Sequence, residues 1–405
     1  SEDTIYFVDI PGSAITNNEG TAYVGTGFTF QSKYTIYELW GWGRNFRGAV
    51  GSNSSFPVSI SSPVQIPGTD WKDVVNSFGY SNYPSVASKT DGTLWTWGSN
   101  ENGGLGLNQG PGNDYSSPVQ IPGTTWGTTK DKMTTMVKGG LNIRTDGTLW
   151  SWGYNTSGEL GQGNTTQYSS PVQIPGTSWA KVFAGTMKSA AIRTDGTLWM
   201  WGNAYQGQLG LNQGGAGDVT VQSPTQIPGS TWSTVSTGFY ETFALKTDGT
   251  LWAWGNNADG QLGQNVGGNP GDRSSPVQIP GTDWNYVRGG YSFGMATRTD
   301  GTLWMWGENG SGALGQNNRT QYSSPVQVGS DTTWNGAYLI GQGQNSAGAL
   351  KTDGTLWAWG IGSWGELGQN SRVSYSSPVQ IPGTWAKITG PGGLAGFHGL
   401  KSIDA

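Results

Sequence analysis

The chain has 405 residues, no cysteine, one histidine and a net charge of −5, and charged residues make up only 12% of it. Without cysteine it forms neither disulfides nor thiolate metal sites, and its acidic balance argues against nucleic acid, whose phosphates require clustered Lys and Arg. No apolar run approaches the ~20 residues of a membrane span, and the polar, weakly ionic composition favours an extracellular or particle-surface protein over a cytoplasmic one.

Residues 1–34 precede the repetitive part of the chain. They contain two strand-like runs, TIYFVDI and TAYVGTGFTF, separated by an Asn- and Gly-rich segment. We expect them to form a short N-terminal β arm. Two roles are open for this arm, either a cap over the domain that follows or a docking arm for another subunit or particle.

From residue 35 to residue 405 the chain repeats itself. TDGTLW occurs six times, ALKTDGTLWAWG occurs twice, and a damaged seventh copy, IYELWGWG, ends at Gly43. The repeat motifs lie near residues 39–43, 90–98, 145–153, 194–202, 247–255, 299–307 and 352–360. A period of 49 to 55 residues without a helical pattern predicts a β-propeller or a similar array.

Residues 232–284 show what one repeat contains. Four strand-like runs, STV, TFALKT, TLWAWG and SPVQIPG, match the four strands of a propeller blade. Between the second and third runs, Asp248-Gly249 predicts a two-residue hairpin turn, in which both residues adopt positive φ. The six aspartates of the T-D-G motif are therefore interpreted as turn residues.

Tryptophan dominates the predicted core. The period of two in TLWAWG places both tryptophans on one face of the strand and Leu251 with Ala253 on the other, so we expect each blade to pack between two neighbours. Fourteen tryptophans lie in the W-x-W-G strands, and seven more follow the Pro-Gly turns, or Val-Gly in one repeat, at Trp71, Trp126, Trp179, Trp232, Trp284, Trp334 and Trp385. Only Trp364 lies outside the pattern.

The two ends of the chain complete one blade. The first copy has Ile36-Tyr37 where the others have Asp-Gly, and the chain ends in HGLKSIDA, which is similar to FALKTDG cut at its turn. We expect two strands of this blade from the C-terminus and two from residues 35–67. The predicted fold is all-β, a seven-bladed β-propeller of four-stranded blades closed by strand exchange between the N- and C-terminal segments, which removes free edges.

The run TDGTLWAWGNNADGQLG at residues 247–263 resembles the repeats of the regulator of chromosome condensation family, with their D-G-x-V/L-x-x-W-G-x-N-x-x-G-Q-L-G pattern. The resemblance spans about residues 35–405 and includes the asparagine after W-G at Asn100, Asn155, Asn257 and Asn309. It implies a seven-bladed propeller, in agreement with the count above.

The known activities of the family differ, and fold does not decide between them. A GTPase exchange factor of the family has a basic tail, whereas this chain begins with the acidic SED. A plant ultraviolet-B photoreceptor uses tryptophans ringed by arginines, whereas arginines are sparse here and the repeat explains 21 of the 22 tryptophans. The better parallel is a secreted β-lactamase inhibitor of the same propeller class, which binds its target through loops on one face.

The sequence offers no catalytic or metal-binding constellation. Its single histidine, His398, lies in the closing strand, where we expect it to be buried with its polar atoms satisfied. Glu159 and Glu366 replace the glutamines of sister repeats and are interpreted as surface substitutions. NNADGQ at residues 256–261 lacks the acidic ligands of a calcium loop. We therefore predict no enzymatic activity, no metal and no cofactor.

The loops that differ between repeats are the candidates for recognition. One set joins the first and second strands and displays aromatic and polar side chains, a mixture typical of binding surfaces. Its candidate binding residues are Tyr80, Tyr83, Tyr240, Glu241, Tyr291 and Phe293. The other set is polar and ends in a recurring tyrosine, at Tyr115, Tyr168, Tyr322 and Tyr375. This recurrence favours packing, with sugar stacking as the alternative.

We therefore expect a non-enzymatic propeller that presents variable loops to a protein or a glycan, on a particle surface or outside the cell. The alternative is a structural subunit of a virion or surface layer, which assembles with copies of itself or with other subunits through residues 1–34. Neither interpretation involves nucleic acid or a membrane span.

Overall fold

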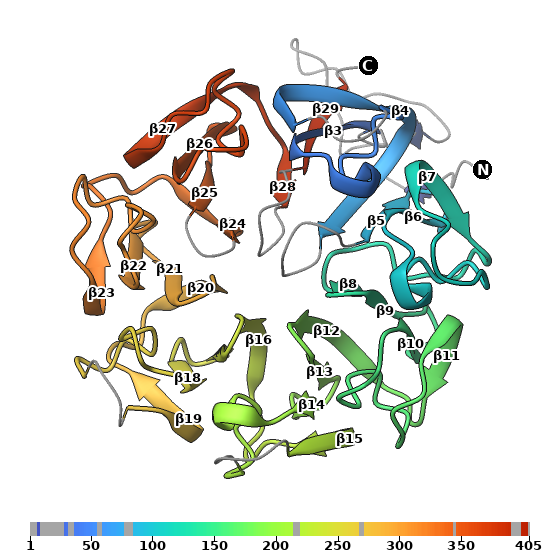
Figure 1. Cartoon of the computed structure of the whole chain (residues 1–405), viewed down its shortest axis with the longest axis horizontal. Coiled ribbons are helices and arrows are strands. Elements are labelled where there is room, and N and C mark those ends of the chain that lie inside the picture. Colours follow the sequence, from blue (N-terminus) through green and yellow to red (C-terminus); the bar gives the residue numbers. More distant parts are fainter. Residues whose placement is uncertain are drawn as a thin grey trace, which may run out of the picture.

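Each sequence repeat folds into one four-stranded antiparallel blade, and the blades surround a central axis (Figure 1). This is a computed structural model, and it describes residues 6–8, 28–30, 36–54, 59–76, 84–213, 219–266, 271–342, 346–389 and 398–403. Within the chain so described, no helix is long and apolar enough to cross a membrane.

Five blades are continuous in sequence, and each begins with its innermost strand. In chain order their strands are β8 (Met133–Met136), β9 (Gly139–Ile143), β10 (Leu149–Gly153) and β11 (Tyr168–Ile174); β12 (Trp179–Gly185), β13 (Lys188–Arg193), β14 (Leu198–Asn203) and β15 (Thr220–Gln226); β16 (Trp232–Thr237), β17 (Glu241–Lys246), β18 (Leu251–Gly255) and β19 (Arg273–Ile279); β20 (Trp284–Gly289), β21 (Phe293–Arg298), β22 (Leu303–Gly307) and β23 (Tyr322–Gln327); β24 (Trp334–Gln342), β25 (Ser346–Lys351), β26 (Thr355–Gly360) and β27 (Tyr375–Thr384).

The other two blades share one long strand. Their strands are β28 (Lys387–Thr389), β29 (His398–Ile403), β3 (Ile36–Arg44), β4 (Ser59–Asn76), β5 (Ser85–Lys89), β6 (Leu94–Gly98) and β7 (Tyr115–Ile121), in this order across one sheet. The first half of β4 completes the blade of β28, β29 and β3, termed the seam blade, and its second half opens the next blade. Pairing of β29 with β3, from His398↔Gly41 to Ile403↔Ile36, confirms the predicted closure by the two chain ends.

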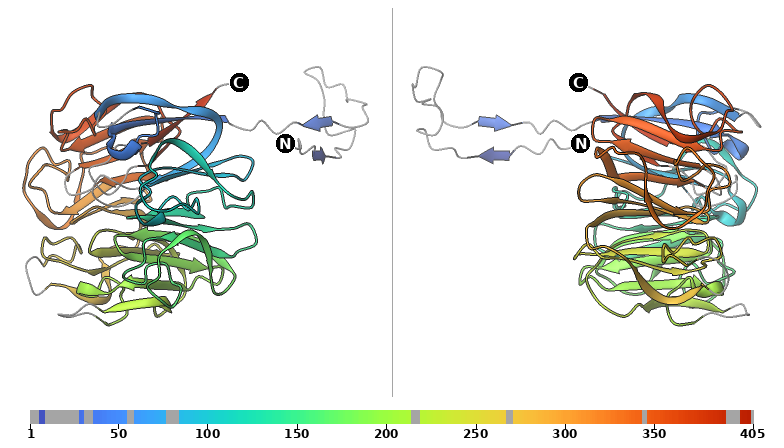
Figure 2. Two further views of the ribbon diagram at one scale, coloured as in Figure 1. Left: turned by 45° about the vertical axis from the view of Figure 1, so that its right-hand side comes forward. Right: turned by 90° about the vertical axis from the view of Figure 1, so that its left-hand side faces the viewer.

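The remaining elements are short. Three 3-10 turns, η1 (Phe46–Gly48), η2 (Glu101–Gly103) and η3 (Tyr205–Gly207), follow third strands of blades. Near the N-terminus, β1 (Tyr6–Val8) pairs with β2 (Phe28–Phe30) in antiparallel fashion, and Figure 2 shows this pair apart from the disc. The role of residues 1–34 stays a prediction.

The T-D-G-T turns have a different geometry from the one predicted. The amide of Gly249 donates to the carbonyl of Lys246 and the amide of Lys246 to that of Thr250, which makes a three-residue loop instead of a two-residue one. Only the glycine has positive φ, at +78°. The Asp248 carboxylate accepts from the amide and the hydroxyl of Thr250, at 3.0 and 2.7 Å. The aspartate is therefore a turn residue, as expected, but it acts through its side chain.

The indoles form the core, as predicted. The second tryptophan of every W-x-W-G strand and every tryptophan after a Pro-Gly turn are buried, and the first tryptophan of each strand is half-buried. In β18, Trp252 and Trp254 pack against the preceding blade, while Leu251 and Ala253 pack against the following one. Each blade thus fills the space between two neighbours with its two apolar faces.

A repeated hydrogen bond joins six of the blades to the one before. The indole of Trp254 donates to the carbonyl of Gln208 at 3.0 Å, in the preceding blade's G-x-L-G loop. Equivalent bonds of 2.7 to 3.2 Å are made by Trp97, Trp152, Trp201, Trp306 and Trp359. The last glycine of the loop, Gly210, has φ of +69°, and a Cβ there would lie 2.8 Å from the Trp254 indole nitrogen. This close approach explains why the motif ends in glycine.

A cation sits between two tryptophans in every blade. The Lys246 ammonium lies 4.8 Å from the ring centroid of Trp232 and 4.4 Å from that of Trp252. The same place is filled by Lys89, Arg144, Arg193, Arg298, Lys351 and, in the seam blade, Lys401. Six of these cations directly precede a T-D-G turn, and Lys401 stands in the matching position of β29. Seven of the 21 Lys and Arg residues are therefore structural.

Replacing Lys246 tests this cation–π clamp. Lys246→Met keeps the aliphatic stem and removes the charge, so we expect it to lower the free energy of unfolding by about 1 to 2 kcal/mol. Lys246→Arg is the matched control and stays near the wild type, because Arg193 and Arg298 occupy the equivalent place. The measurement is denaturant unfolding followed by circular dichroism. Equal stability of the two variants would show that the ammonium contributes nothing.

Candidate functional site

The variable loops share one face of the disc. In an antiparallel blade, the connection from the first to the second strand and that from the third to the fourth leave from the same edge. Both loop sets singled out in the sequence therefore lie on this side, termed the loop face. The T-D-G-T and Pro-Gly turns lie on the opposite side, termed the turn face. The right-hand view of Figure 2 shows the disc edge-on.

The asparagine after W-G holds the longer loops in shape. Its side-chain oxygen accepts from the amide of the leucine in G-x-L-G, as in Asn155 with Leu160 at 2.8 Å. Its amide group donates to carbonyls farther along, here those of Asn164 and Thr166, at 3.0 and 2.8 Å. Asn100, Asn257 and Asn309 bond in the same way. The recurring asparagine is thus a loop staple, and the residues between its partners are left to vary.

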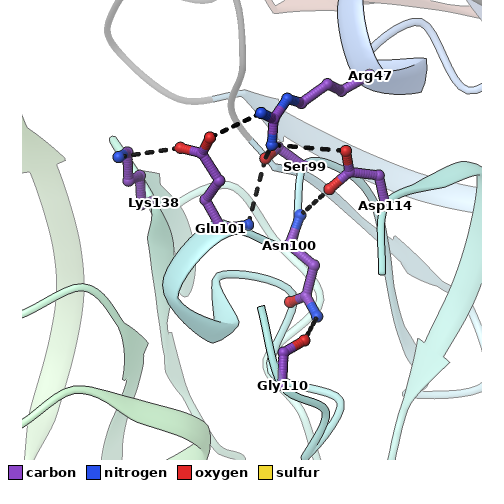
Figure 3. A network of polar contacts seen from close by, with 7 residues as sticks. All are labelled: Arg47, Ser99, Asn100, Glu101, Gly110, Asp114 and Lys138. Atoms are coloured by element: carbon purple, nitrogen blue, oxygen red, sulfur yellow. Dashed lines mark hydrogen bonds and ion pairs between the residues drawn. The ribbon is translucent and has the colours of Figure 1, made fainter. Parts of the chain in front are cut away.

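An ion-pair network links three blades on the loop face (Figure 3). The Arg47 guanidinium, beside β3, lies 2.9 Å from the Glu101 carboxylate and 3.6 Å from that of Asp114, both in the next blade. Lys138, one blade farther on, lies 3.0 Å from Glu101. These side chains keep about a fifth to a third of their surface exposed, so each pair contributes only up to about 1 kcal/mol. The network fixes loop positions across the seam more than it stabilises the fold.

Glu159 is not a surface substitution, contrary to the expectation. Its side chain is 3% exposed and Glu366 is 2% exposed, because the position that glutamine holds in other repeats lies under the loop. The Glu159 carboxylate accepts from the amide of Ser157 at 2.8 Å, as the side-chain oxygen of Gln261 accepts from Asp259. Burial raises the pKa of Glu159 to about 7.

The tyrosines before Ser-Ser serve packing. All four are half-buried, and Tyr168, Tyr322 and Tyr375 lie against the apolar clusters between blades. The hydroxyl groups of Tyr168 and Tyr322 accept from Asn164 and Asn318, each at 3.3 Å. The packing interpretation is therefore supported for Tyr168, Tyr322 and Tyr375.

An aromatic cluster stands on the loop face where two blades meet. The rings of Phe239 and Tyr240 lie 4.4 Å apart, and Tyr291 of the next blade lies 4.5 Å from Phe239 and 6.3 Å from Tyr240. All three are half-buried, and burial raises the pKa of the Tyr240 phenol. Nearby Tyr205, at the start of η3, is 43% exposed. The cluster, termed the aromatic patch, comprises Phe239, Tyr240 and Tyr291.

A buried lysine from the preceding blade holds the patch from below. The Lys188 ammonium donates to the carbonyls of Phe239 and Glu241, at 3.2 and 2.9 Å, and Lys188 and Glu241 are both 0% exposed. One Glu241 oxygen accepts from the amide of Tyr240 at 3.2 Å. Burial lowers the pKa of Lys188 to about 7 and raises that of Glu241 to about 8. The turn that carries two patch rings is thus fixed by polar groups beneath it.

The structure separates the six predicted binding residues. Tyr240 and Tyr291 lie together in the patch, whereas Glu241 and Phe293 are fully buried and present no surface to a partner. Tyr80 and Tyr83 lie outside the described residues. Phe239 was missed, although it stands in the same GFYETF loop, and Lys188 was missed because its partners are 51 and 53 positions away in sequence.

The described part of the chain shows no cluster of three or more His, Cys, Asp or Glu that could hold a metal ion. His398 is 2% exposed, and its Nε2 lies 3.1 Å from the carbonyl of Val50. Burial lowers its pKa to about 4. The histidine is therefore a neutral core residue, as expected, which leaves the loop face as the candidate site.

Comparison with known proteins places this geometry in a family. The model described as RCC1-like domain matches residues 38–394. The ultraviolet-B receptor UVR8 of Arabidopsis thaliana is 28% identical over 347 residues, covering 84% of this chain and 76% of UVR8. RUG3, a mitochondrial RCC1 domain-containing protein of the same plant, is 29% identical over 309 residues, 72% of this chain and 66% of RUG3. The structure of yeast RCC1 (Prp20) bound to Kap60 superposes with a TM-score of 0.75 at 17% identity, over 92% of this chain and 90% of that one.

Glu159→Gln tests the buried carboxyl of the loop face through pH. Because the folded-state pKa of Glu159 is about 7 against an ordinary 4.5, the native state binds more protons than the unfolded state between these values, and stability falls as pH rises. We expect the unfolding free energy of the variant, relative to that of the wild type, to rise by about 2 to 3 kcal/mol as the pH increases from 4.5 to 7.5. Urea unfolding across this range measures it, and a difference that does not change with pH contradicts the assignment.

Proposed function

The chain belongs to the RCC1-like domain family, and from that premise we propose that it is a non-enzymatic binding module that recognises a protein partner with its loop face. The observation that carries this proposal is the aromatic patch. Three rings from two blades stand together on the one face where the repeats differ. On the turn face, by contrast, the repeated tryptophans are already occupied by a cation and by each other.

The chemistry of the patch suits a protein surface. Phe239 offers apolar area, while Tyr240 and Tyr291 combine large rings with hydroxyl groups at their rim, the composition that dominates binding hot spots. The Lys188 bonds hold the turn in place before a partner arrives, which lowers the conformational entropy lost on binding. Yeast RCC1 carries a protein, Kap60, in its structure, and we extend protein recognition to this chain on that parallel.

The alternatives from sequence analysis have less support. A glycan partner rested on the tyrosines before Ser-Ser, whose rings are engaged in packing. A structural role in a virion or surface layer, in which residues 1–34 and the loops contact neighbouring subunits, stays a prediction. A location on a particle or outside the cell stays a prediction.

Removal of the aromatic patch tests the proposed function. The variant Phe239→Ala/Tyr240→Ala/Tyr291→Ala leaves Lys188 and Glu241 in place, so we expect a folded protein that loses at least about tenfold in affinity, equivalent to 1.4 kcal/mol. Val373→Ala, at a side chain 54% exposed on the loop face of another blade, is the matched control. The measurement is quantitative co-purification with the full-length chain from its native source, followed by titration of the captured protein. A protein that binds the triple variant as tightly as the wild type and the control overturns the proposed site.

A further inference from the structure

The centre of the disc holds a polar cavity. Its volume is about 310 Å³, and residues of the innermost strands of all seven blades line it. Figure 1 shows these strands around the axis of the disc. This volume lies at the lower end of the roughly 300–1,000 Å³ typical of small-molecule sites. The cavity is separate from the aromatic patch, none of whose three residues lines it.

Positive charge is concentrated at this cavity. Lys130, Lys181 and Arg288 line it together with Asp73 and Asp131, and Lys387 lies 3.8 Å from the Asp73 carboxylate. Four cations and two carboxylates give a local charge of +2 in a chain whose net charge is −5. Excess charge of one sign in a partly desolvated cavity is unfavourable unless a counter-ion neutralises it.

Each carboxylate already has partners. Asp73 is 6% exposed and accepts from the amides of Val74 and Lys130, at 3.1 and 2.9 Å, in addition to the nearby Lys387. Asp131 lies 3.8 Å from the Lys181 ammonium. Two carboxylates thus face four cations, and the net charge of these groups is +2.

Each of the two lysines at the cavity has N–H groups beyond the one that bonds to a carbonyl. Lys130 reaches across the channel, where its ammonium bonds to the carbonyl of Ala337 and lies 4.5 Å from the Tyr338 ring centroid. The Lys181 ammonium donates to the carbonyl of Ser233 at 2.8 Å. An ammonium has three donors, so one carbonyl bond leaves each lysine able to bind an anion as well.

Burial is the main cause of the lowered pKa values of these cations, and neighbouring cations add to it at Lys130. Burial lowers the pKa of Lys130, the Asp73 and Asp131 carboxylates oppose this change, and Arg288 and Lys387 reinforce it. Burial also lowers the pKa of the Arg288 guanidinium to about 10. A dianion between these groups would reverse both effects, because a nearby opposite charge favours the protonated cation.

We propose that the central channel binds a small oxyanion of the phosphate class, held by Arg288 together with Lys130 and Lys181. Monohydrogen phosphate carries two negative charges, which would neutralise the net charge of the lining. Its oxygens can accept hydrogen bonds from side chains of blades on different sides of the channel. The planar guanidinium of Arg288 suits a pair of oxygens on one phosphate. The bound anion would tie blades together at their innermost strands.

The test is isothermal titration of inorganic phosphate into the full chain, in phosphate-free buffer with ionic strength held constant by sodium chloride. We expect saturable binding by the wild type and a loss of at least about tenfold in affinity in Arg288→Gln, because a hydrogen-bonded charge pair contributes about 1.5–3 kcal/mol. Arg319→Gln, at an exposed arginine of the loop face, is the matched control and binds as the wild type does.

A second variant keeps the test decisive. Lys181 keeps 36% of its side chain exposed, so its replacement should leave the fold intact. If Arg288→Gln does not fold, Lys181→Gln is compared with the wild type instead, and we expect it to weaken phosphate binding as well. Binding that chloride at equal ionic strength reproduces, or undiminished binding by folded Arg288→Gln and Lys181→Gln, overturns the proposal. Because the aromatic patch is not involved, these outcomes are independent of protein recognition on the loop face.

Discussion

The bond from a buried indole to the carbonyl of the preceding blade is the contact on which the ring depends. A blade has two apolar faces and gains stability only between neighbours, so the distance between blades must be fixed. The Trp254 indole helps to set it, because its buried N–H donates to the Gln208 carbonyl and would lose this acceptor if the blades moved apart. Gly210 allows the approach, since any Cβ there would collide with the indole. The same arrangement recurs in five other blades, which explains the recurring spacing within the repeats.

This constraint divides the molecule into a constant side and a variable side. On the turn face, the cation between two tryptophans and the Asp–Thr–Trp hydrogen-bond chain repeat from blade to blade, so little there is able to change. On the loop face, the asparagine staple holds each long loop at its base and leaves the tip to vary. The aromatic patch lies on the variable side and draws its support from Lys188 in the preceding blade. The proposed binding surface therefore lies where folding makes the fewest demands.

Most of the fold could be predicted from the sequence, because repeated sequence motifs indicate repeated structural units. Blade number and the tryptophan core followed from the repeated W-x-W-G, and closure by the chain ends followed from the incomplete first copy and the final HGLKSIDA. The sequence also held an unused signal, the Lys or Arg before every T-D-G. The site was harder. Exposure of a loop residue depends on the neighbouring blade, so Glu241 and Phe293 could not be told apart from Tyr240 and Tyr291 by pattern alone. Glu159 was misjudged for the same reason, since the loop that covers it is defined by packing.

Hydrogen exchange of the indole N–H groups, followed by NMR, tests the central claim most directly. The bonded indoles, such as those of Trp254 and Trp306, are fully buried and donate to a neighbouring blade, so they should exchange only when the whole ring opens, all at one slow rate. The indoles of Trp252 and Trp304 are half-buried and bond to a threonine of their own turn, so they should exchange faster. Equal rates for the two classes would contradict the claim that the bond between blades holds the propeller together.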